Sequence, residues 1–215
     1  IVDKLNTYNI SVILDFHQDC LSELFCGEGI PLWAVNIDNS SMRFPAPLYG
    51  GPYKLDENDV PTKENCDKHE WYLYQLSKQT SYAYQNFYDN INRIRDSFVN
   101  FWRVVAIKFR NCKNCIGYEL INEPWIGDIF RHPSLIIPGY ADYYNLQPLY
   151  EELNKAIRNI DDEHIIFFEP VTMSIFGSGF TQVPGGEKYE NRSVLAYHYY
   201  NPPNPSLSLM YYVRM

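Results

Sequence analysis

The segment ELINEPW, residues 119–125, contains a carboxyl group placed for acid–base chemistry. Glu123 follows a run of mostly apolar residues and stands between Asn122 and Pro124. Proline restricts the backbone of the residue before it, and Pro124 therefore predicts that Glu123 is extended where a strand ends. With Trp125 nearby to lower the local dielectric, a carboxyl group held there can act as a general acid. We predict that Glu123 is a catalytic residue.

Further polar side chains follow apolar runs elsewhere in the chain, and each stands where a strand would end. These residues are His17, Gln18, Asp19, Asn122, Glu169, His198 and Tyr200. Their imidazole, carboxyl, amide and phenol groups can bind a polar ligand and transfer protons. Strands that end in so many groups requiring hydrogen-bond partners are expected to open onto a polar cavity.

Four short apolar runs predict the strands that carry these residues. They are SVILDF (11–16), IGYELI (116–121), HIIFFE (164–169) and SVLAYHYY (193–200). Nearly continuous hydrophobic character is typical of strands that are buried on both faces, as in a parallel sheet.

Two helical patterns lie between the predicted strands. Over residues 78–109, apolar side chains three and four positions apart form one stripe, which predicts a single long helix. The stripe consists of Phe87, Ile91, Ile94, Phe98, Trp102, Val105 and Phe109. A second helix is predicted over 148–160, with Pro148 in its first turn. The segments 20–76 and 122–145 have the composition of loops, and each follows a strand and precedes a helix.

The succession of strand, long loop, helix and strand predicts an α/β fold with a parallel sheet and right-handed crossovers. Both a doubly wound sheet and a (β/α)8 barrel fit this order. In either fold, ligands bind at the carboxyl ends of the strands, where the polar residues stand. In a barrel, all of these side chains would point into one bowl.

Composition and charge exclude several classes of function. The chain has 215 residues, of which 46% are hydrophobic and 20% charged, as in ordinary globular proteins. No window approaches the roughly 18 uninterrupted apolar residues of a transmembrane helix. A formal net charge of −8 argues against nucleic acid as a partner. A nicotinamide enzyme is disfavoured because no Gly-x-Gly-x-x-Gly follows a strand; GSGF at 177–180 follows a loop.

The cysteines and glycosylation signals bear on the compartment. The cysteines are Cys20, Cys26, Cys66, Cys112 and Cys115, and only the last two form a CxxC pair. A lone CxxC without further ligands at zinc spacing predicts no metal site. Asn-x-Ser sequons occur at Asn9, Asn39 and Asn191. Together these features predict a secreted or lumenal protein, either extracellular or lysosomal. The disulfide pairing is left open, because five cysteines leave one over.

Asn-Glu-Pro after a strand resembles the acid/base signature of glycoside hydrolase family 5 and its clan of retaining (β/α)8-barrel glycosidases. The stretches DFHQDCLSELFCGEGIPLWAV, SYAYQNFYDN and GYELINEPW resemble the endoglycoceramidase branch of that family. The similarity extends from about residue 9 to residue 203. It implies a (β/α)8 TIM barrel that is present only in part, with the third to sixth strands in this chain. Residues 1–215 would then be an incomplete catalytic domain whose first and last parts are missing.

The resemblance also implies roles for the residues at the strand ends. Glu123 would be the acid/base, and Asn122 would bind the 2-hydroxyl of the sugar in the −1 subsite. His198 and Tyr200 would position the catalytic nucleophile. That nucleophile follows the seventh strand in the family, so it would lie outside this chain, and the 215-residue product should be inactive. Glu169 is interpreted as a substrate-contacting or structural carboxylate.

The remaining predicted substrate contacts lie in the first long loop. The resemblance makes His17 and Asp19 the sugar-binding pair after the third strand. Trp71 is predicted to form the floor of the sugar site from its approximate position alone. Trp33 and Trp125 could belong either to the core or to the cleft.

The resulting prediction is a retaining glycosidase that hydrolyses the β-glycosidic bond between an oligosaccharide and ceramide. A glucosylceramidase or sterylglucosidase of the same family and a non-catalytic glycolipid-binding protein are the alternatives. The chemistry requires no cofactor and no metal. The expected partner is a glycosphingolipid or another glycolipid, with contact to lipid surfaces or micelles but no transmembrane segment.

Overall fold

The computed structural model describes residues 1–35, 43–172 and 177–198. Tyr200, which is predicted to contact substrate, and the sequon at Asn39 lie outside these described residues.

Four parallel strands form one sheet in the order β1-β2-β3-β4. Their bounds are Val12–Asp15 for β1, Cys115–Glu119 for β2, Ile165–Phe168 for β3 and Ser193–Leu195 for β4. Each overlaps one of the predicted apolar runs but is shorter than that run. The predicted parallel sheet is therefore confirmed.

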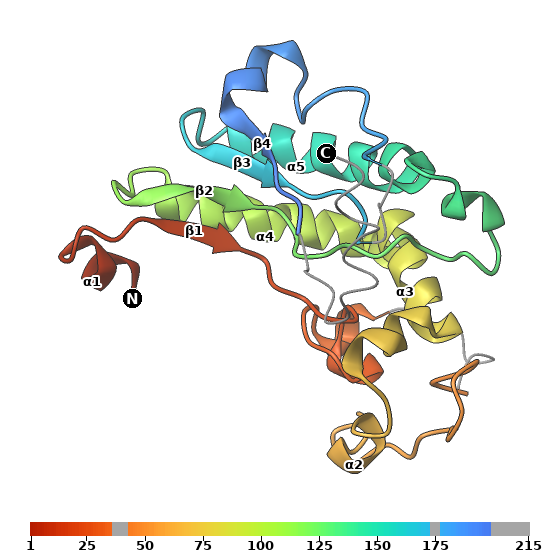
Figure 1. Cartoon of the computed structure of the whole chain (residues 1–215). Helices are drawn as coiled ribbons and strands as arrows, with labels where there is room; N and C mark the ends of the chain where they lie inside the picture. Colours follow the sequence, from red (N-terminus) through yellow and green to blue (C-terminus); the bar gives the residue numbers. More distant parts are fainter. Residues whose placement is uncertain (36–42, 173–176, 199–215) are drawn as a thin grey trace, which may run out of the picture.

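Helices cover one face of this sheet. Helices α4 (Ile94–Phe109) and α5 (Gln147–Arg158) lie along the same side of the strands (Figure 1). The Tyr118 ring on β2 packs against Trp102 of α4, with ring centroids 5.9 Å apart. A doubly wound sheet would carry helices on both faces, whereas a barrel carries them only on the outside. The arrangement is therefore that of a partial (β/α)8 barrel.

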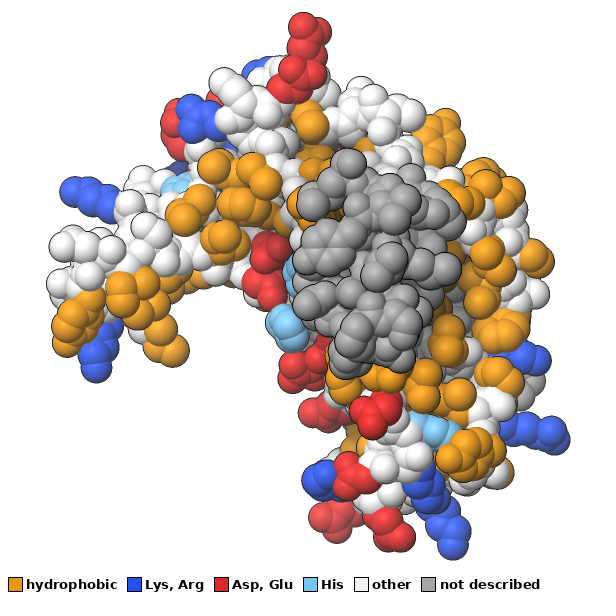
Figure 2. Space-filling view, viewed as in Figure 1, with side chains coloured by type: hydrophobic (Ala, Val, Ile, Leu, Met, Phe, Trp, Pro, Cys, Tyr) orange, Lys and Arg blue, Asp and Glu red, His pale blue; other side chains and the backbone are white. Residues whose placement is uncertain are grey.

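The opposite face of the sheet is concave and carries acidic side chains. The strand register places Asp15 beside Glu119, and Glu119 beside Phe167. Figure 2 shows acidic and histidine side chains gathered along the concave side of the molecule. Ile13 and Val194 are exposed, although parallel strands are usually covered on both faces. This is the face that points into the bowl of a barrel.

The predicted single helix over 78–109 is wrong, because two helices occupy this segment. Helix α3 spans Lys78–Tyr88, and α4 begins only at Ile94. Between them, Asn90 and Asn92 adopt left-handed backbone conformations, which asparagine tolerates better than most residues. The Asn90 side chain also accepts a hydrogen bond from the backbone N–H of Asp96, at 3.1 Å. The chain turns here, so Ile91 leaves the apolar stripe and is exposed.

The second predicted helix is confirmed as α5. Leu149, Leu153 and Ile157 are fully buried and form its inner face. A π-helical segment, η7 (Asp142–Leu146), precedes it directly. The Asp142 carboxylate accepts hydrogen bonds from the backbone N–H groups of Val171 and Gly179, each at 2.8 Å. These bonds attach the beginning of α5 to the loop that follows β3.

Short helices occupy the long loops and the chain's beginning. They are α1 (Val2–Asn6), η1 (Glu23–Phe25), η2 (Leu32–Ala34), α2 (Lys63–Cys66), η4 (Trp71–Leu76), η5 (Ile91–Arg93), η6 (Pro133–Ile136) and η8 (Glu187–Arg192). None of the helices in the described part of the chain combines the length and apolar character of a membrane span.

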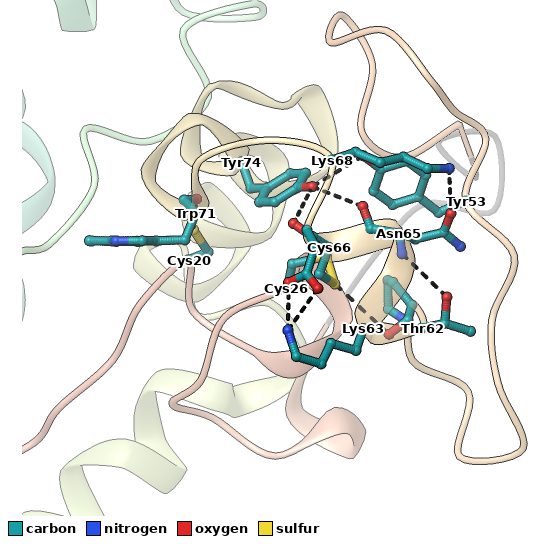
Figure 3. The surroundings of a disulfide bond; sticks show 12 residues. Cys20, Cys26, Tyr53, Thr62, Lys63, Asn65, Cys66, Lys68, Trp71 and Tyr74 are labelled. Carbon is teal, nitrogen blue, oxygen red and sulfur yellow. Dashed lines mark hydrogen bonds and ion pairs between the residues drawn. A yellow bond between two sulfur atoms is a disulfide. The ribbon is translucent and has the colours of Figure 1, made fainter.

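Two disulfides settle the pairing that the sequence leaves open. Cys26 is bonded to Cys66 across 40 residues, and Cys112 is bonded to Cys115. Figure 3 shows the first of these bonds, which joins the segment after η1 to α2. Cys20 is the remaining cysteine, and its buried thiol donates a hydrogen bond to the backbone oxygen of Trp71 at 3.3 Å.

Candidate active site

Glu123 lies just beyond the end of β2 and is only 5% exposed. The prediction that it is extended is wrong, because its φ is +41°, in the left-handed region. For a residue other than glycine, this conformation costs about 1–3 kcal/mol and persists only where the surroundings enforce it. Such strain occurs preferentially at functional sites. Neighbouring side chains must therefore hold the Glu123 backbone.

Glu123 and His198 are in direct contact. The Oε1 atom of Glu123 lies 2.7 Å from Nδ1 of His198, which follows β4. These residues are 75 positions apart in sequence, and the parallel sheet brings their strand ends together. An imidazole at this distance orients the carboxyl group and can exchange a proton with it.

Gln18 belongs to the polar cluster after the first predicted strand, but the sequence assigns it no individual role. Its side-chain Nε2 donates hydrogen bonds to the backbone oxygens of Asn122, at 2.6 Å, and Glu123, at 3.0 Å. Its Oε1 accepts hydrogen bonds from the Leu21 N–H, at 2.8 Å, and from the Tyr84 hydroxyl. The signal was present in the sequence, since Gln18 stands between the two predicted sugar-binding residues.

The segment after β1, which contains Phe16 and Gln18, also holds Asn122 in place. Its side-chain Nδ2 donates to the backbone oxygen of Gln18 at 3.1 Å, and its backbone N–H donates to Phe16 O at 3.0 Å. The residue is buried. The Asn122 amide is consequently locked in one orientation beside Glu123.

Glu169 contacts both Glu123 and His198 from the end of β3. Its Oε2 accepts a hydrogen bond from the backbone N–H of Glu123 at 3.2 Å. Its Oε1 lies 3.5 Å from Nε2 of His198. The side chain is almost completely buried, and burial together with the negative charge of Glu119 raises the pKa of Glu169 to about 8. Burial and the neighbouring negative charge therefore favour the protonated form of Glu169.

Two further carboxyl groups line the concave face below Glu169. Glu119 and Asp15 both have a pKa above the ordinary value, because partial burial disfavours their charged forms. The sequence analysis gave neither residue a role, although both stand inside predicted strands. An acidic residue within an otherwise apolar strand is the signal that could have identified them.

His17 and Asp19 lie at the same edge but are more accessible. His17 Nδ1 is 3.0 Å from Asp15 Oδ2, and its Nε2 is 3.7 Å from Asp19 Oδ2. Burial acts to lower the pKa of His17, but the hydrogen bond to Asp15 and the charges of Asp15, Asp19 and Glu28 raise it overall. Burial raises the pKa of Asp19. A partly exposed imidazole and carboxyl side by side are suited to binding hydroxyl groups.

The tryptophans differ in their surroundings. Trp125 is buried, and its indole N–H donates to Ser81 Oγ at 3.2 Å, so it belongs to the core. Trp33 is 73% exposed. Trp71 is 44% exposed, and its side chain points away from the Cys26–Cys66 disulfide (Figure 3). The hydrogen bond from Cys20 to the Trp71 carbonyl oxygen places Trp71 near Asp19, and its role as the floor of the sugar site stays a prediction.

A pocket of about 300 Å³ opens beside Glu123, Glu169 and His198. Its remaining walls come from the loop after β3 and the end of β4. The lining residues there are Pro170, Val171, Thr172, Gly177, Ser178, Leu195 and Tyr197. Of the polar groups predicted to share one hollow, Glu123, Glu169 and His198 line this pocket at the carboxyl ends of the strands, where barrel enzymes place their active sites.

The parallel sheet with outer helices and the Asn-Glu pair at a strand end fit the class of (β/α)8-barrel glycosidases that the sequence resembles. Comparison with known families agrees, because the model of Cellulase (glycosyl hydrolase family 5) matches residues 1–208. The chain belongs to glycosyl hydrolase family 5.

Two curated relatives have the same printed name. The chain is 49% identical over 216 residues to an endoglycoceramidase of Hydra vulgaris, a match that covers 100% of this chain and 41% of the relative. It is 48% identical over 216 residues to an endoglycoceramidase of Cyanea nozakii, covering 100% of this chain and 42% of that relative. The chain thus spans less than half the length of these relatives. Its interpretation as an incomplete domain stays a prediction.

A solved structure supports the fold. Endo-glycoceramidase II from Rhodococcus sp. superposes with a TM-score of 0.70 over 99% of this chain and 46% of that chain. The sequence identity is 21%, so this likeness concerns the fold alone.

Proposed function

We propose that the protein containing these residues is a retaining endoglycosidase that releases an intact oligosaccharide from ceramide in glycosphingolipids. The relatives in Hydra vulgaris and Cyanea nozakii support this substrate class by their name, endoglycoceramidase. Solved structures of the Rhodococcus enzyme include a ganglioside GM3 complex and a lactosyl-enzyme intermediate. A lactosyl-enzyme intermediate is the product of a covalent, retaining mechanism.

The observation that carries the proposal is the contact between Glu123 and His198. Glu123 is the proposed acid/base: it gives its proton to the oxygen that leaves with ceramide while a second carboxylate attacks the anomeric carbon. The glycosidic C–O bond breaks, and a glycosyl ester forms. Glu123 then takes a proton from water, whose oxygen displaces the ester and releases the sugar. His198, at 2.7 Å from Glu123 Oε1, orients the carboxyl group for both transfers.

Glu169 does not fit the role of the second carboxylate. A nucleophile must be ionised and must face the anomeric carbon. The Glu169 carboxyl is instead buried, has a pKa raised to about 8, and accepts the backbone N–H of Glu123. The identity of the nucleophile and the role of Tyr200 both stay predictions from the family resemblance.

The remaining residues are proposed to bind the sugar. Asn122, whose amide is held by the Gln18 carbonyl, would bind the 2-hydroxyl. His17 and Asp19, which lie 3.7 Å apart, would bind further hydroxyls, and the accessible ring of Trp71 would stack on a sugar face.

A lipid-facing surface is proposed on the segment between β2 and α5. Exposed apolar and aromatic side chains gather in this segment: Phe130, Ile136, Ile137, Tyr140, Tyr143 and Tyr144. Such a surface suits contact with micelles or membranes that present a glycolipid. We also propose that the protein is secreted or lumenal, because its two disulfides are typical of oxidising compartments.

The test is the product formed by the full-length protein from GM3 and from glucosylceramide. Release of the intact GM3 oligosaccharide together with ceramide is the expected result. Release of glucose from glucosylceramide alone would instead indicate a glucosylceramidase. Binding of GM3 without any product would indicate a non-catalytic binding protein and would overturn the proposal.

A further inference from the structure

The peptide groups on both sides of Glu123 are held by buried side chains from two other strand ends. Gln18, after β1, donates from Nε2 to the carbonyl oxygen of Glu123. Glu169, after β3, accepts the Glu123 N–H with Oε2. Because Glu123 has a left-handed φ of +41°, its backbone needs such external support. We call Gln18 and Glu169 the Glu123 clamp.

Every hydrogen-bonding group of the Gln18 side chain has a partner. The Gln18 side chain has no exposed surface, and both its amide hydrogens and its carbonyl oxygen are used. The Tyr84 hydroxyl and the Leu21 N–H hold Oε1, which fixes the direction of Nε2. Gln18 therefore acts as a rigid donor toward the Asn122 and Glu123 carbonyls.

The Glu169 side joins the backbone of Glu123 to the ring of His198. One oxygen of the carboxyl group contacts the Glu123 N–H, and the other is 3.5 Å from His198 Nε2. The backbone oxygen of Glu169 accepts a hydrogen bond from the buried Tyr150 hydroxyl at 2.8 Å, so the residue is itself anchored. The Glu169 side chain thus lies against both the backbone of the proposed acid/base and the ring of the histidine that orients it.

We propose that Gln18 and Glu169 are positioning residues for the reaction, which together hold Glu123 in its left-handed conformation against His198. This inference rests on the proposed function. Neither residue needs to touch the substrate; both act through Glu123.

We expect the Glu123 clamp to require the protonated, neutral form of the Glu169 carboxyl group. Ionisable groups face its carboxyl from several elements: Asp15 on β1, Glu119 on β2, Glu123 beyond β2, Tyr150 on α5 and His198 beyond β4. Negative charge on Glu119, Glu123 and Asp15 disfavours ionisation of Glu169. A neutral glutamine, which keeps the acceptor oxygen and the shape, should therefore replace the protonated glutamic acid.

The experiment measures kcat and KM of the full-length protein on GM3 as functions of pH, together with the melting temperature. The variants are Glu169→Gln, Glu169→Leu and Gln18→Leu. Asn154→Leu is the matched control, because Asn154 is also a buried amide but lies in α5, outside the proposed site.

We expect Glu169→Leu and Gln18→Leu to lower kcat by about a hundredfold with KM close to wild type, the effect of a small misplacement of a catalytic group. Asn154→Leu should keep the wild-type kcat after allowance for its melting temperature. Glu169→Gln should keep kcat near pH 6 and lose the decline in rate near pH 8 that ionisation of Glu169 produces in the wild type.

Three results would overturn the inference. The first is wild-type kcat in both leucine variants; the second is a Glu169→Gln variant as impaired as Glu169→Leu. The third is an alkaline decline in Glu169→Gln that matches the wild type, a readout that does not depend on the leucine variants folding. A full-length wild type without activity on GM3 would overturn the proposed function together with the clamp, whereas an active wild type with unaffected variants would overturn the clamp alone.

Discussion

Asp15 on β1 lies directly opposite Glu119 on β2 in the strand register. Glu169, at the end of β3, is the third carboxyl group of this acidic row. Negative charge on Glu119 disfavours the ionisation of Glu169. All three carboxyl groups have a raised pKa, so they resist ionisation in the folded protein. The row links the stability of the fold to the protonation of the site.

The acidic row predicts that stability falls as the pH rises from about 4.5 to 8. In this window the unfolded state has released the Glu169 proton, whereas the folded state retains it until its pKa of about 8. The free energy of unfolding of the full-length protein, measured by denaturant titration across the window, should therefore decrease. Glu169→Gln should flatten this dependence, whereas Glu64→Gln, a change at an exposed position on α2, should not. A wild type whose stability is constant from pH 5 to 8 would contradict the prediction.

Replacing Glu123 with glutamine should lower kcat on GM3 by about 10² to 10⁴, because the leaving oxygen loses its proton donor. KM should change little, since the side chain keeps its size. The measurement is steady-state kinetics of the full-length protein, with Glu64→Gln as the control for a carboxyl-to-amide change. Retained activity in Glu123→Gln would exclude this residue as the acid/base.

Replacing Asp19 with alanine should act mainly on substrate binding. A lost hydrogen bond to a charged group weakens binding by about 1.5–3 kcal/mol, which corresponds to an increase in KM of roughly 10- to 100-fold. The expected signature is a raised KM with kcat near wild type. An unchanged KM together with a strongly reduced kcat would show that Asp19 contributes to the chemistry instead.

Removing the Cys26–Cys66 disulfide should destabilise the protein. A bond that closes a loop of 40 residues stabilises by about 2–4 kcal/mol, chiefly by restricting the unfolded chain. The double change Cys26→Ser and Cys66→Ser should lower the free energy of unfolding by this amount. The same change at Cys112 and Cys115, which close a very short loop, should have a smaller effect. Equal losses from the two pairs would contradict the loop-length argument.

The four strands could be predicted because each overlaps a nearly continuous run of apolar residues, the pattern of a buried strand. The prediction failed between α3 and α4, where Asn90 and Asn92 turn the chain within an uninterrupted apolar stripe. Apolar periodicity reports which side chains are buried, but a left-handed asparagine leaves no mark on that pattern. Local turn chemistry therefore decided this boundary.

Motifs in the sequence singled out Glu123 and His198, which the structure brings into contact, and the catalytic roles of both residues stay predictions. Gln18 received no individual role because the carbonyl groups that its side chain binds, those of Asn122 and Glu123, come from another strand end. The conformation of Glu123 was predicted wrongly from Pro124 alone, because the contacts with Gln18 and Glu169 come from other strands. Long-range hydrogen bonds of this kind are invisible to reasoning on adjacent residues.

The left-handed backbone at Glu123 has a practical consequence for enzyme engineering. Grafting the Asn-Glu-Pro triplet into a foreign barrel would transfer the carboxyl group without the scaffold that bends its peptide. A successful transplant has to bring the glutamine and the glutamic acid from two neighbouring strand ends along with it.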